Sequence, residues 1–186
     1  MYSLFFREKR KTVLVHRRFE IARNVSSLPR NKKELERLYT AKLAFQFHLH
    51  IYPKGHYIPH IEKWFREPEN FTTATVAEEH EYLNADWEPQ FVADESVPLH
   101  DERFPLRMRS NTHLGSLLCR KGYTFTVVND LFSVHWDIKR KEPKENVYLK
   151  RAAVRNGYRQ TVKSFRAMLD MLYPETKDKC PFPKLN

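Results

Sequence analysis

The chain has 186 residues, of which 41% are hydrophobic and 13% aromatic, so it has the composition of a folded domain and not of a disordered chain. Its 33 basic and 23 acidic residues give a formal net charge of +10, which favours anionic partners such as nucleotide-linked sugars, acidic glycans or nucleic acid. No run of about 18 apolar residues is present, so the sequence predicts no membrane-spanning helix. We expect one domain over residues 1–186.

The chain begins with a predicted strand and a predicted helix. Residues 11–16 (KTVLVH) are β-branched or apolar at their centre, which indicates a short strand. Asn31 and Glu34 fit a capping box, in which each side chain satisfies a backbone N–H at the start of a helix. This box predicts a helix over residues 32–42.

The next segment alternates in polarity. In residues 43–51 aromatic and aliphatic side chains alternate with polar ones, which predicts a half-buried strand with His48 and His50 on its polar face. Residues 61–66 predict a single helical turn. The acidic stretch at residues 67–86 lacks a hydrophobic period, which predicts a surface loop.

Residues 91–92 predict a short strand between two prolines, and residues 112–121 predict a helix that ends at Gly122. Two apolar strands follow, at residues 123–128 and 131–136, joined by a tight turn at Asn129-Asp130.

A long amphipathic helix is predicted for residues 146–173. Its apolar positions are spaced four and three residues apart, and Pro174 ends it. Together these elements predict a mixed α/β domain with a long C-terminal helix.

Four histidines lie close together in the sequence, and we considered them as a zinc site: His48, His50, His56 and His60. No cysteine lies nearby, and the prolines and glycine between the histidines scatter their directions. Ordinary histidines on a polar face are therefore the favoured interpretation.

The acidic pair Asp101-Glu102 precedes Arg103, which could hold a neighbouring carboxylate ionised. Such a carboxylate can act as a general base or accept hydrogen bonds from sugar hydroxyls. A turn with a local ion pair explains the same residues, so both interpretations stay open.

His135 lies near the end of an apolar strand and is followed by Trp136. A histidine in this setting is usually a core residue. As a ligand of a divalent ion it would need carboxylate partners. Trp136 is either part of the core or a flat platform for a sugar ring.

Cys119 and Cys180 form no metal motif; they would pair in an oxidising compartment or remain free thiols. Asn24 and Asn70 each begin an Asn-x-Ser/Thr motif and are glycan acceptors if the chain enters the secretory pathway.

Several ordered blocks resemble glycosyltransferase family 49, the group of the dystroglycan β-1,4-glucuronyltransferase and the second catalytic domain of the LARGE-type enzymes. The blocks span most of the chain: TVLVHRRFE (12–20), LPRNKKELERLY (28–39), PKGHYIPHIEKW (53–64), DWEPQFVA (86–93), VPLHDERF (97–104), GYTFTVVNDLFSVHW (122–136) and YPETKDKC (173–180).

The resemblance implies a Rossmann-like GT-A fold and transfer of glucuronic acid or xylose from a nucleotide sugar to a glycan, with manganese, by a type II membrane protein of the Golgi. It implies that His135 is a metal ligand. It aligns Asp101 and Glu102 with an acidic pair of catalytic or acceptor-binding role. Arg103, Trp64 and Trp136 are then candidate acceptor contacts.

Three departures limit the resemblance. The family's Gly-containing aromatic stretch after DERF is replaced by PLRMRSN (105–111), and Trp136 after the histidine is particular to this chain. The third departure concerns the metal. The family's Asp-x-Asp metal motif occurs nowhere in this chain, so we expect residues 1–186 to be the C-terminal part of the domain, without its donor-binding half or membrane anchor. The alternative is a relative that binds a glycan or a partner without turnover. A nucleic-acid-binding domain rests on charge alone and is not expected.

Overall fold

The central strand of the domain is β1 (Thr12–Ile21), which is buried along most of its length. The computed structural model describes residues 11–105 and 108–182, and within them five strands form one mixed sheet. On one side of β1 lies the parallel strand β5 (Thr124–Trp136). On the other side lie two short antiparallel strands, β4 (Gln90–Val92) and β2 (Ala44–Gln46). The predicted α/β class is therefore confirmed.

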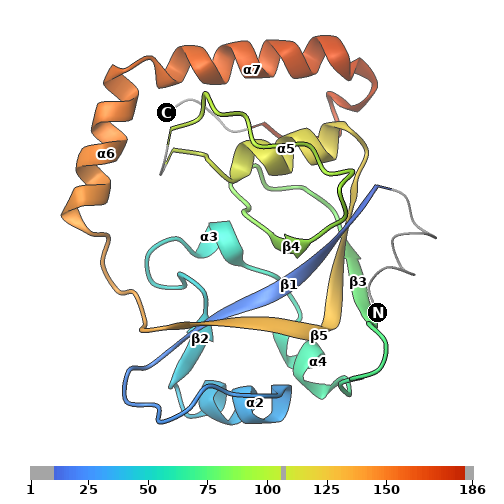
Figure 1. Ribbon diagram of the computed structural model, residues 1–186, viewed down its shortest axis with the longest axis vertical. Coiled ribbons are helices and arrows are strands. Elements are labelled where there is room, and N and C mark those ends of the chain that lie inside the picture. Colours follow the sequence, from blue (N-terminus) through green and yellow to red (C-terminus); the bar gives the residue numbers. More distant parts are fainter. Residues whose placement is uncertain (1–10, 106–107, 183–186) are drawn as a thin grey trace.

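Strand β5 is continuous but turns a corner at its middle (Figure 1). In its register with β1, residues 128–131 of β5 stand opposite the single residue His16. The corner is anchored by Asp130, whose carboxylate accepts hydrogen bonds from the backbone N–H groups of Asn70 (2.6 Å) and Thr75 (2.5 Å). The predicted hairpin with a turn at Asn129-Asp130 is wrong, because these side chains pair with another segment instead of closing a turn.

The partner of the first half of β5 is β3 (Val76–His80), at the edge of the sheet. This strand lies within residues 67–86, for which the sequence predicted a surface loop. Its side chains are all exposed or half-buried and follow no alternating pattern, so no hydrophobic period marks it.

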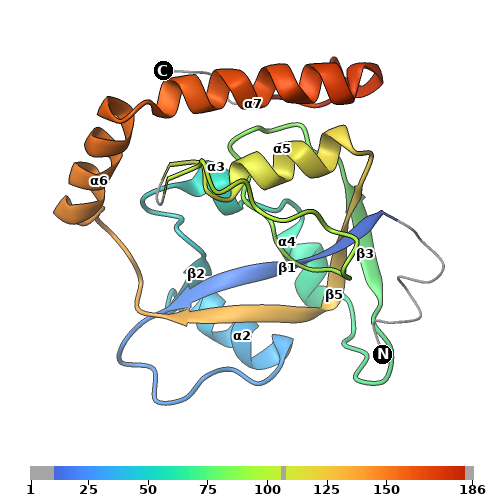
Figure 2. The ribbon, with the colours of Figure 1, turned by 45° about the horizontal axis from the view of Figure 1, so that its top comes forward.

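Helices cover both faces of the sheet (Figure 2). On one face, α5 (Thr112–Arg120) packs against the sheet, and α7 (Tyr158–Leu172) packs over α5 through Val162, Phe165 and Leu169. On the other face, α2 (Lys32–Thr40) and α4 (Ile61–Arg66) bury Leu35 and Trp64 against the second half of β1. The capping box is confirmed: Asn31 Oδ1 accepts from the Glu34 N–H at 2.8 Å.

The predicted C-terminal helix is two helices. α6 (Lys144–Arg155) ends before Gly157, and α7 begins after it. Gly157 has φ +86°, a left-handed conformation that favours glycine and breaks the helix. A short 3₁₀ turn, η1 (Pro174–Thr176), follows α7. No helix among the described residues is long and apolar enough to cross a membrane.

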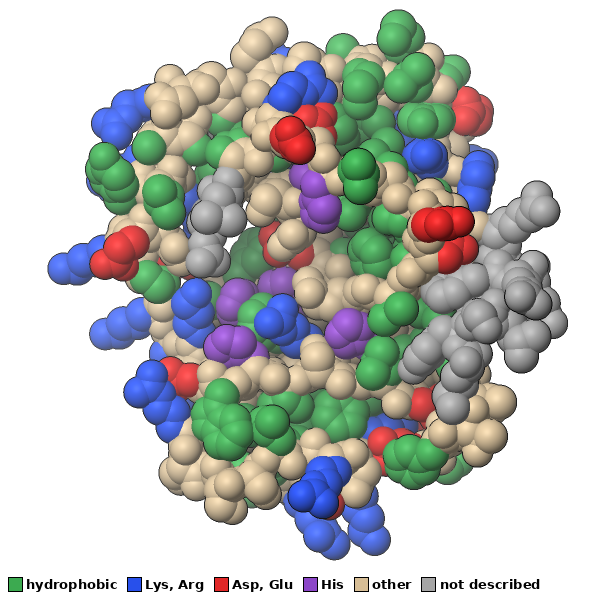
Figure 3. Space-filling model, in the orientation of Figure 1, with side chains coloured by type: hydrophobic (Ala, Val, Ile, Leu, Met, Phe, Trp, Pro, Cys, Tyr) green, Lys and Arg blue, Asp and Glu red, His purple; other side chains and the backbone are tan. Residues whose placement is uncertain are grey.

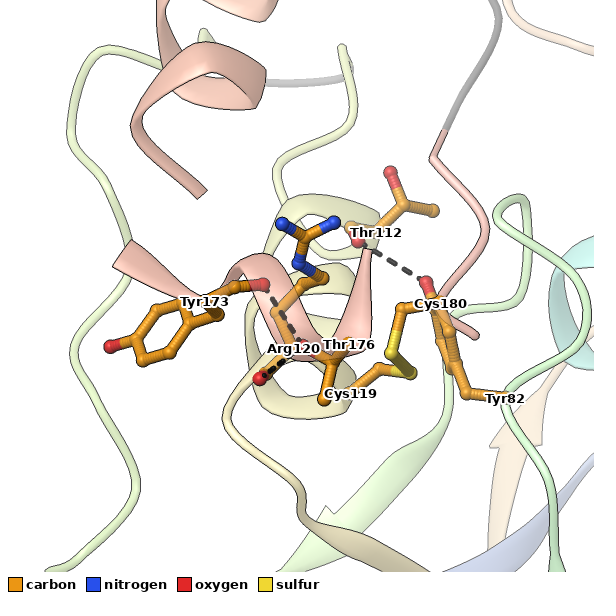
Figure 4. The surroundings of a disulfide bond; sticks show 7 residues. All are labelled: Tyr82, Thr112, Cys119, Arg120, Tyr173, Thr176 and Cys180. Atoms are coloured by element: carbon orange, nitrogen blue, oxygen red, sulfur yellow. Dashed lines mark hydrogen bonds between the residues drawn. A yellow bond between two sulfur atoms is a disulfide. The ribbon is translucent and has the colours of Figure 1, made fainter. Parts of the chain in front are cut away.

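The last described residues are tied covalently to α5 (Figure 4). Cys119, near the end of α5, forms a disulfide with Cys180. Beside it, the Thr176 hydroxyl donates to the Arg120 carbonyl at 2.8 Å, and the Arg120 guanidinium donates to the Leu169 carbonyl at 2.8 Å. The sequence left open whether the two cysteines pair or remain free thiols, and the structure shows that they pair. Hydrogen bonds around the disulfide also join α5 to α7 and η1.

Candidate functional site

The parallel strands β1 and β5 bring two polar side chains together near their C-terminal ends. In their register Glu20 stands opposite His135, and Ile21 stands opposite Trp136. In α/β proteins, ligands commonly bind beyond the carboxyl ends of parallel strands. This end of the sheet is therefore a candidate location for a ligand-binding site.

Glu20 is fully buried, at 0% exposure. Its Oε2 accepts a hydrogen bond from the Lys139 N–H at 3.2 Å, whereas its Oε1 makes no hydrogen bond of ordinary geometry among the described residues, although the His48 backbone N–H is close enough to lower the pKa of the carboxyl. Burial raises the pKa of this carboxyl above its ordinary value, because the charged form loses hydration. A buried carboxyl with one unpaired oxygen is unusual, and it indicates either a functional role or a binding partner that is absent from the structure.

Next to Glu20 lies His48, whose Nε2 is 3.8 Å from Glu20 Oε1. The predicted strand over residues 43–51 is shorter than expected, because β2 ends at Gln46 and His48 adopts a left-handed conformation with φ 56°. His48 and His50 therefore do not share a strand face. The His48 ring stacks on Phe47 at 3.8 Å between centroids, and burial lowers the pKa of His48 to about 3.

His56 completes this group from the four-residue helix α3 (Pro53–His56). Its ring centroid lies 5.1 Å from that of His48. Burial lowers the pKa of His56 to about 4, and its Nδ1 lies 3.3 Å from the Glu88 carbonyl oxygen. Both imidazoles are therefore neutral at physiological pH, with a nitrogen lone pair able to accept a hydrogen bond.

Cationic groups border the same region. The Arg18 guanidinium lies over the Phe47 ring at 4.0 Å, and the positive charge of Lys139 is close enough to His48 to contribute to its lowered pKa. On the face drawn in Figure 3, histidine side chains gather around a hollow over α3 and the end of β2. We call the group Glu20, His48, His56, Glu88 and His135 the histidine hollow. Its charges and lone pairs suit a polar, partly anionic ligand.

Of the residues expected from the sequence, His135 and Trp136 lie at this end of the sheet. Both are exposed, and the His135 ring lies 5.8 Å from Phe47. Glu20, Arg18 and Glu88 were missed. The available signal was Glu20 itself, a carboxylate inside an apolar strand, which is rarely buried without a purpose.

The acidic pair lies elsewhere, next to α5 and α7. The Asp101 carboxylate accepts hydrogen bonds from Arg103 Nε and Nη2, and the Asp101 backbone N–H donates to His113 Nε2 at 2.9 Å. The Arg103 guanidinium lowers the pKa of Asp101 and also reaches Ser164 on α7 at 3.4 Å. Glu102 is exposed. The local ion pair considered from the sequence is therefore present.

The expectation that Trp64 is a sugar platform is wrong. Trp64 is 1% exposed, stacks on Phe19 at 5.9 Å, and donates its indole N–H to the Val128 carbonyl at 3.3 Å. Its apolar surface fills the core between α4 and β1, so no face is left for a ligand.

The described residues do not by themselves fit a metal ion. Among residues 11–105 and 108–182, no three His, Cys, Asp or Glu side chains are grouped as a metal site. His60, of the four clustered histidines, lies apart at the start of α4 with Glu78 at 4.0 Å. A metal bound by His135 would need further ligands from outside this set.

Comparison with known proteins identifies the lineage. Residues 2–174 match the family described as glycosyl-transferase for dystroglycan. The chain belongs to this family. It is therefore a member of a family of glycosyltransferases, as the ordered sequence blocks implied.

Two kinds of relative are similar to the chain. It is 29% identical over 175 residues to beta-1,4-glucuronyltransferase 1 of Mus musculus, which covers 91% of this chain and 39% of the relative. It is 30% identical over 126 residues to xylosyl- and glucuronyltransferase LARGE1 of Gallus gallus, which covers 67% of this chain and 16% of that relative. The chain thus spans well under half the length of these curated relatives.

Proposed function

We propose that residues 1–186 form the acceptor-side, C-terminal portion of a GT-A-like glycosyltransferase that moves glucuronic acid or xylose from a nucleotide sugar to a glycan. The family match over residues 2–174 carries this proposal. The histidine hollow supports it, because it gathers neutral imidazoles, a buried carboxyl and cationic groups at the C-terminal ends of two parallel strands.

In the proposed reaction a base takes the proton of an acceptor hydroxyl, and the oxygen attacks the anomeric carbon of the donor. The new glycosidic bond forms as the bond from the anomeric carbon to the diphosphate breaks, and the diphosphate leaves with the electron pair. Arg103 makes Asp101 a weak base by lowering its pKa, so Asp101 fits a contact to acceptor hydroxyls better than proton abstraction. We therefore propose the exposed carboxylate of Glu102, in place of Asp101, as the base that takes the proton of the acceptor hydroxyl.

Manganese and a nucleotide sugar belong to the same proposal as the cofactor and donor of the family. His135 would contribute one ligand from the end of β5, and Trp136, 42% exposed, would offer a ring face to a sugar. Because the described residues lack a complete ligand set, no reaction step is assigned to the ion.

The proposed site of action is the Golgi lumen. Disulfides form and persist in oxidising compartments, and Cys119 is bonded to Cys180. Asn24 is exposed in the turn after β1 and is the better proposed glycan acceptor. The Asn70 side chain is engaged, since its Nδ2 donates to the Thr73 hydroxyl at 3.0 Å. Any membrane anchor would lie outside the described residues.

A donor screen tests the proposal. The full-length protein is incubated with manganese, a glycan acceptor and a panel of nucleotide sugars, and the released nucleoside diphosphate is measured. We expect turnover with a glucuronic acid or xylose donor and its loss in His135→Ala. His60→Ala is the matched control, because His60 is an exposed histidine at the start of α4. Unchanged turnover in His135→Ala contradicts the metal role, and glycan binding without turnover for any donor favours a non-catalytic relative.

A further inference from the structure

A second concave site is lined in part by α3, the short helix that carries His56. It is a pocket of about 590 Å³, within the range of small-ligand sites. The side chains that line it come from α3, the segment after it, the end of β3 and the loop that follows: Pro53, Lys54, Tyr57, Pro59, His80, Glu81, Leu83, Asn84 and Trp87. None of these residues belongs to the histidine hollow. We call this site the Tyr57 pocket.

Hydrogen bonds hold the two walls of the Tyr57 pocket together. Asn84 Nδ2 donates to the Lys54 carbonyl at 3.2 Å, and the Glu88 N–H donates to the Gly55 carbonyl at 2.6 Å. The Tyr52 hydroxyl donates to the Asp86 carbonyl at 3.0 Å. These bonds fix α3 against residues 84–88, so the pocket exists before any ligand arrives.

The lining combines flat apolar surfaces with a polar rim. Tyr57 is 54% exposed and Leu83 is 72% exposed, so both offer apolar surface to a ligand. Trp87, by contrast, is 3% exposed, and its indole Nε1 has no hydrogen-bond partner among the described residues. A buried indole N–H normally finds a partner. Lys54, Glu81 and Asn84 supply hydrogen-bonding groups around these surfaces.

This combination suits a pyranose ring, which has an apolar C–H face and hydroxyl groups around its edge. A tyrosine ring can cover the apolar face, while amide, ammonium and carboxylate groups bind the hydroxyls. The lining carries one ammonium and one carboxylate, Lys54 and Glu81, so their charges offset each other. Burial lowers the pKa of His80, which keeps that imidazole neutral. The pocket therefore favours an uncharged sugar over a uronic acid.

The Tyr57 pocket and the histidine hollow share two short segments. α3 contributes Lys54 to the pocket and His56 to the hollow. In the same way, Trp87 lines the pocket, while the neighbouring Glu88 carboxylate lies 3.9 Å from His56 Nε2. A glycan could occupy the pocket with one of its sugars while another part of it approaches the hollow around α3.

We propose that the Tyr57 pocket binds an uncharged pyranose unit of the acceptor glycan, remote from the hydroxyl that reacts. The inference rests on the proposed function for the role of this sugar as an acceptor. Tyr57 is then a specificity-determining residue that contacts substrate without taking part in bond making.

Direct binding tests the pocket without reference to activity. The full-length protein is titrated with methyl β-D-xylopyranoside and, separately, with methyl β-D-glucopyranosiduronate, and saturation-transfer NMR follows each probe. We expect the xyloside to bind more tightly than the uronate. Tyr57→Ala should weaken xyloside binding by about tenfold through loss of the ring platform, and Tyr57→Phe should retain it. Tyr148→Ala is the matched control, because Tyr148 is another exposed tyrosine, 66% exposed on α6 and outside the pocket.

Each outcome decides between the two proposals. Equal xyloside binding by Tyr57→Ala and the unchanged protein overturns the pocket assignment, as does the absence of binding. Tighter binding of the uronate overturns the assignment to an uncharged sugar. Binding that depends on Tyr57 in a protein without transferase activity leaves the pocket in place and rejects the proposed function instead. If the proposed function and the pocket assignment are both correct, Tyr57→Ala raises the KM for acceptor and leaves kcat and the KM for donor unchanged.

Discussion

Glu20 and His135 face each other across the parallel pair β1 and β5, although 114 residues separate them in the chain. Glu20 is fully buried while His135 is exposed, so the pair joins the interior of the domain to its surface. The pair therefore places a buried carboxyl beside an exposed imidazole at the end of the sheet where the histidine hollow opens.

Acidification should destabilise the protein through His48 and His56. Their pKa values are lowered from 6.5 to about 3 and about 4, so between these limits the unfolded chain binds protons that the folded chain does not. Stability therefore falls as pH drops below 6.5 and is fully present above it. The raised pKa values of Glu20 and Glu88 act in the opposite direction. We expect the double variant His48→Gln, His56→Gln to lose less thermal stability on acidification.

The measurement is the melting temperature by circular dichroism between about pH 7 and pH 5, where an ordinary histidine titrates. His50→Gln is the control, since His50 is exposed beside the same hollow. An equal slope in the double variant and the unchanged protein would contradict the burial of these two imidazoles.

Removing the charge of Glu20 should stabilise the domain. Its pKa is raised by burial, which means that ionisation at neutral pH costs free energy in the folded state. Glu20→Gln keeps the shape of the side chain, and we expect it to raise the free energy of unfolding at neutral pH, because no charge is then buried. Glu20→Ala should instead lower it by about 1–3 kcal/mol, because the Lys139 N–H loses its acceptor.

Urea unfolding of both variants measures these changes. If Glu20→Gln is more stable and also loses transferase activity, Glu20 is kept for function at a cost in stability. A loss of stability in Glu20→Gln would argue that the buried carboxylate is well compensated.

The disulfide should contribute substantially to stability. The bond between Cys119 and Cys180 closes a loop with a sequence separation of 61 and so restricts the unfolded chain. We expect the double variant Cys119→Ser, Cys180→Ser to lower the free energy of unfolding by about 2–4 kcal/mol. A reducing agent should lower the melting temperature of the unchanged protein and leave that of the double variant where it is. Equal melting of the two proteins without reductant would show that the bond adds nothing.

Gly157 should tolerate substitution poorly for a purely backbone reason. A Cβ at this position meets no atom within 4 Å, so the penalty of Gly157→Ala comes from φ +86° alone. We expect a loss of about 1 kcal/mol, with a smaller loss for Gly157→Asn because asparagine tolerates this region. Thermal unfolding provides the measurement, and Gln160→Ala, an exposed change in the first turn of α7, is the control.

Local signals in the sequence were sufficient for several elements. The capping box at Asn31 and the glycine end of α5 at Gly122 depend on neighbouring residues only, and both are confirmed. The α/β class follows from the same kind of signal. The break at Gly157 had a signal too, a glycine inside a helical pattern, but the apolar spacing on both sides concealed it.

The sequence did not predict contacts between residues that lie far apart in the chain. Asn129 and Asp130 resemble turn residues, yet they bind residues 68–75 and bend one continuous strand. The histidine hollow likewise joins β1, α3 and β5, and no short spacing connects Glu20 to His56 or His135. The family resemblance indicated the lineage and His135, and the folded structure shows the Glu20 carboxyl next to it.

The bond between Cys119 and Cys180 also has a topological consequence. Together with the backbone it makes a closed ring that contains β5, α6 and α7. A protease that cuts the exposed surface of α6 would nick this ring without releasing a fragment, and His135 would stay covalently joined to both pieces. The two pieces would separate only after the disulfide is reduced, so a single cut in α6 would leave the molecule in one piece in an oxidising compartment.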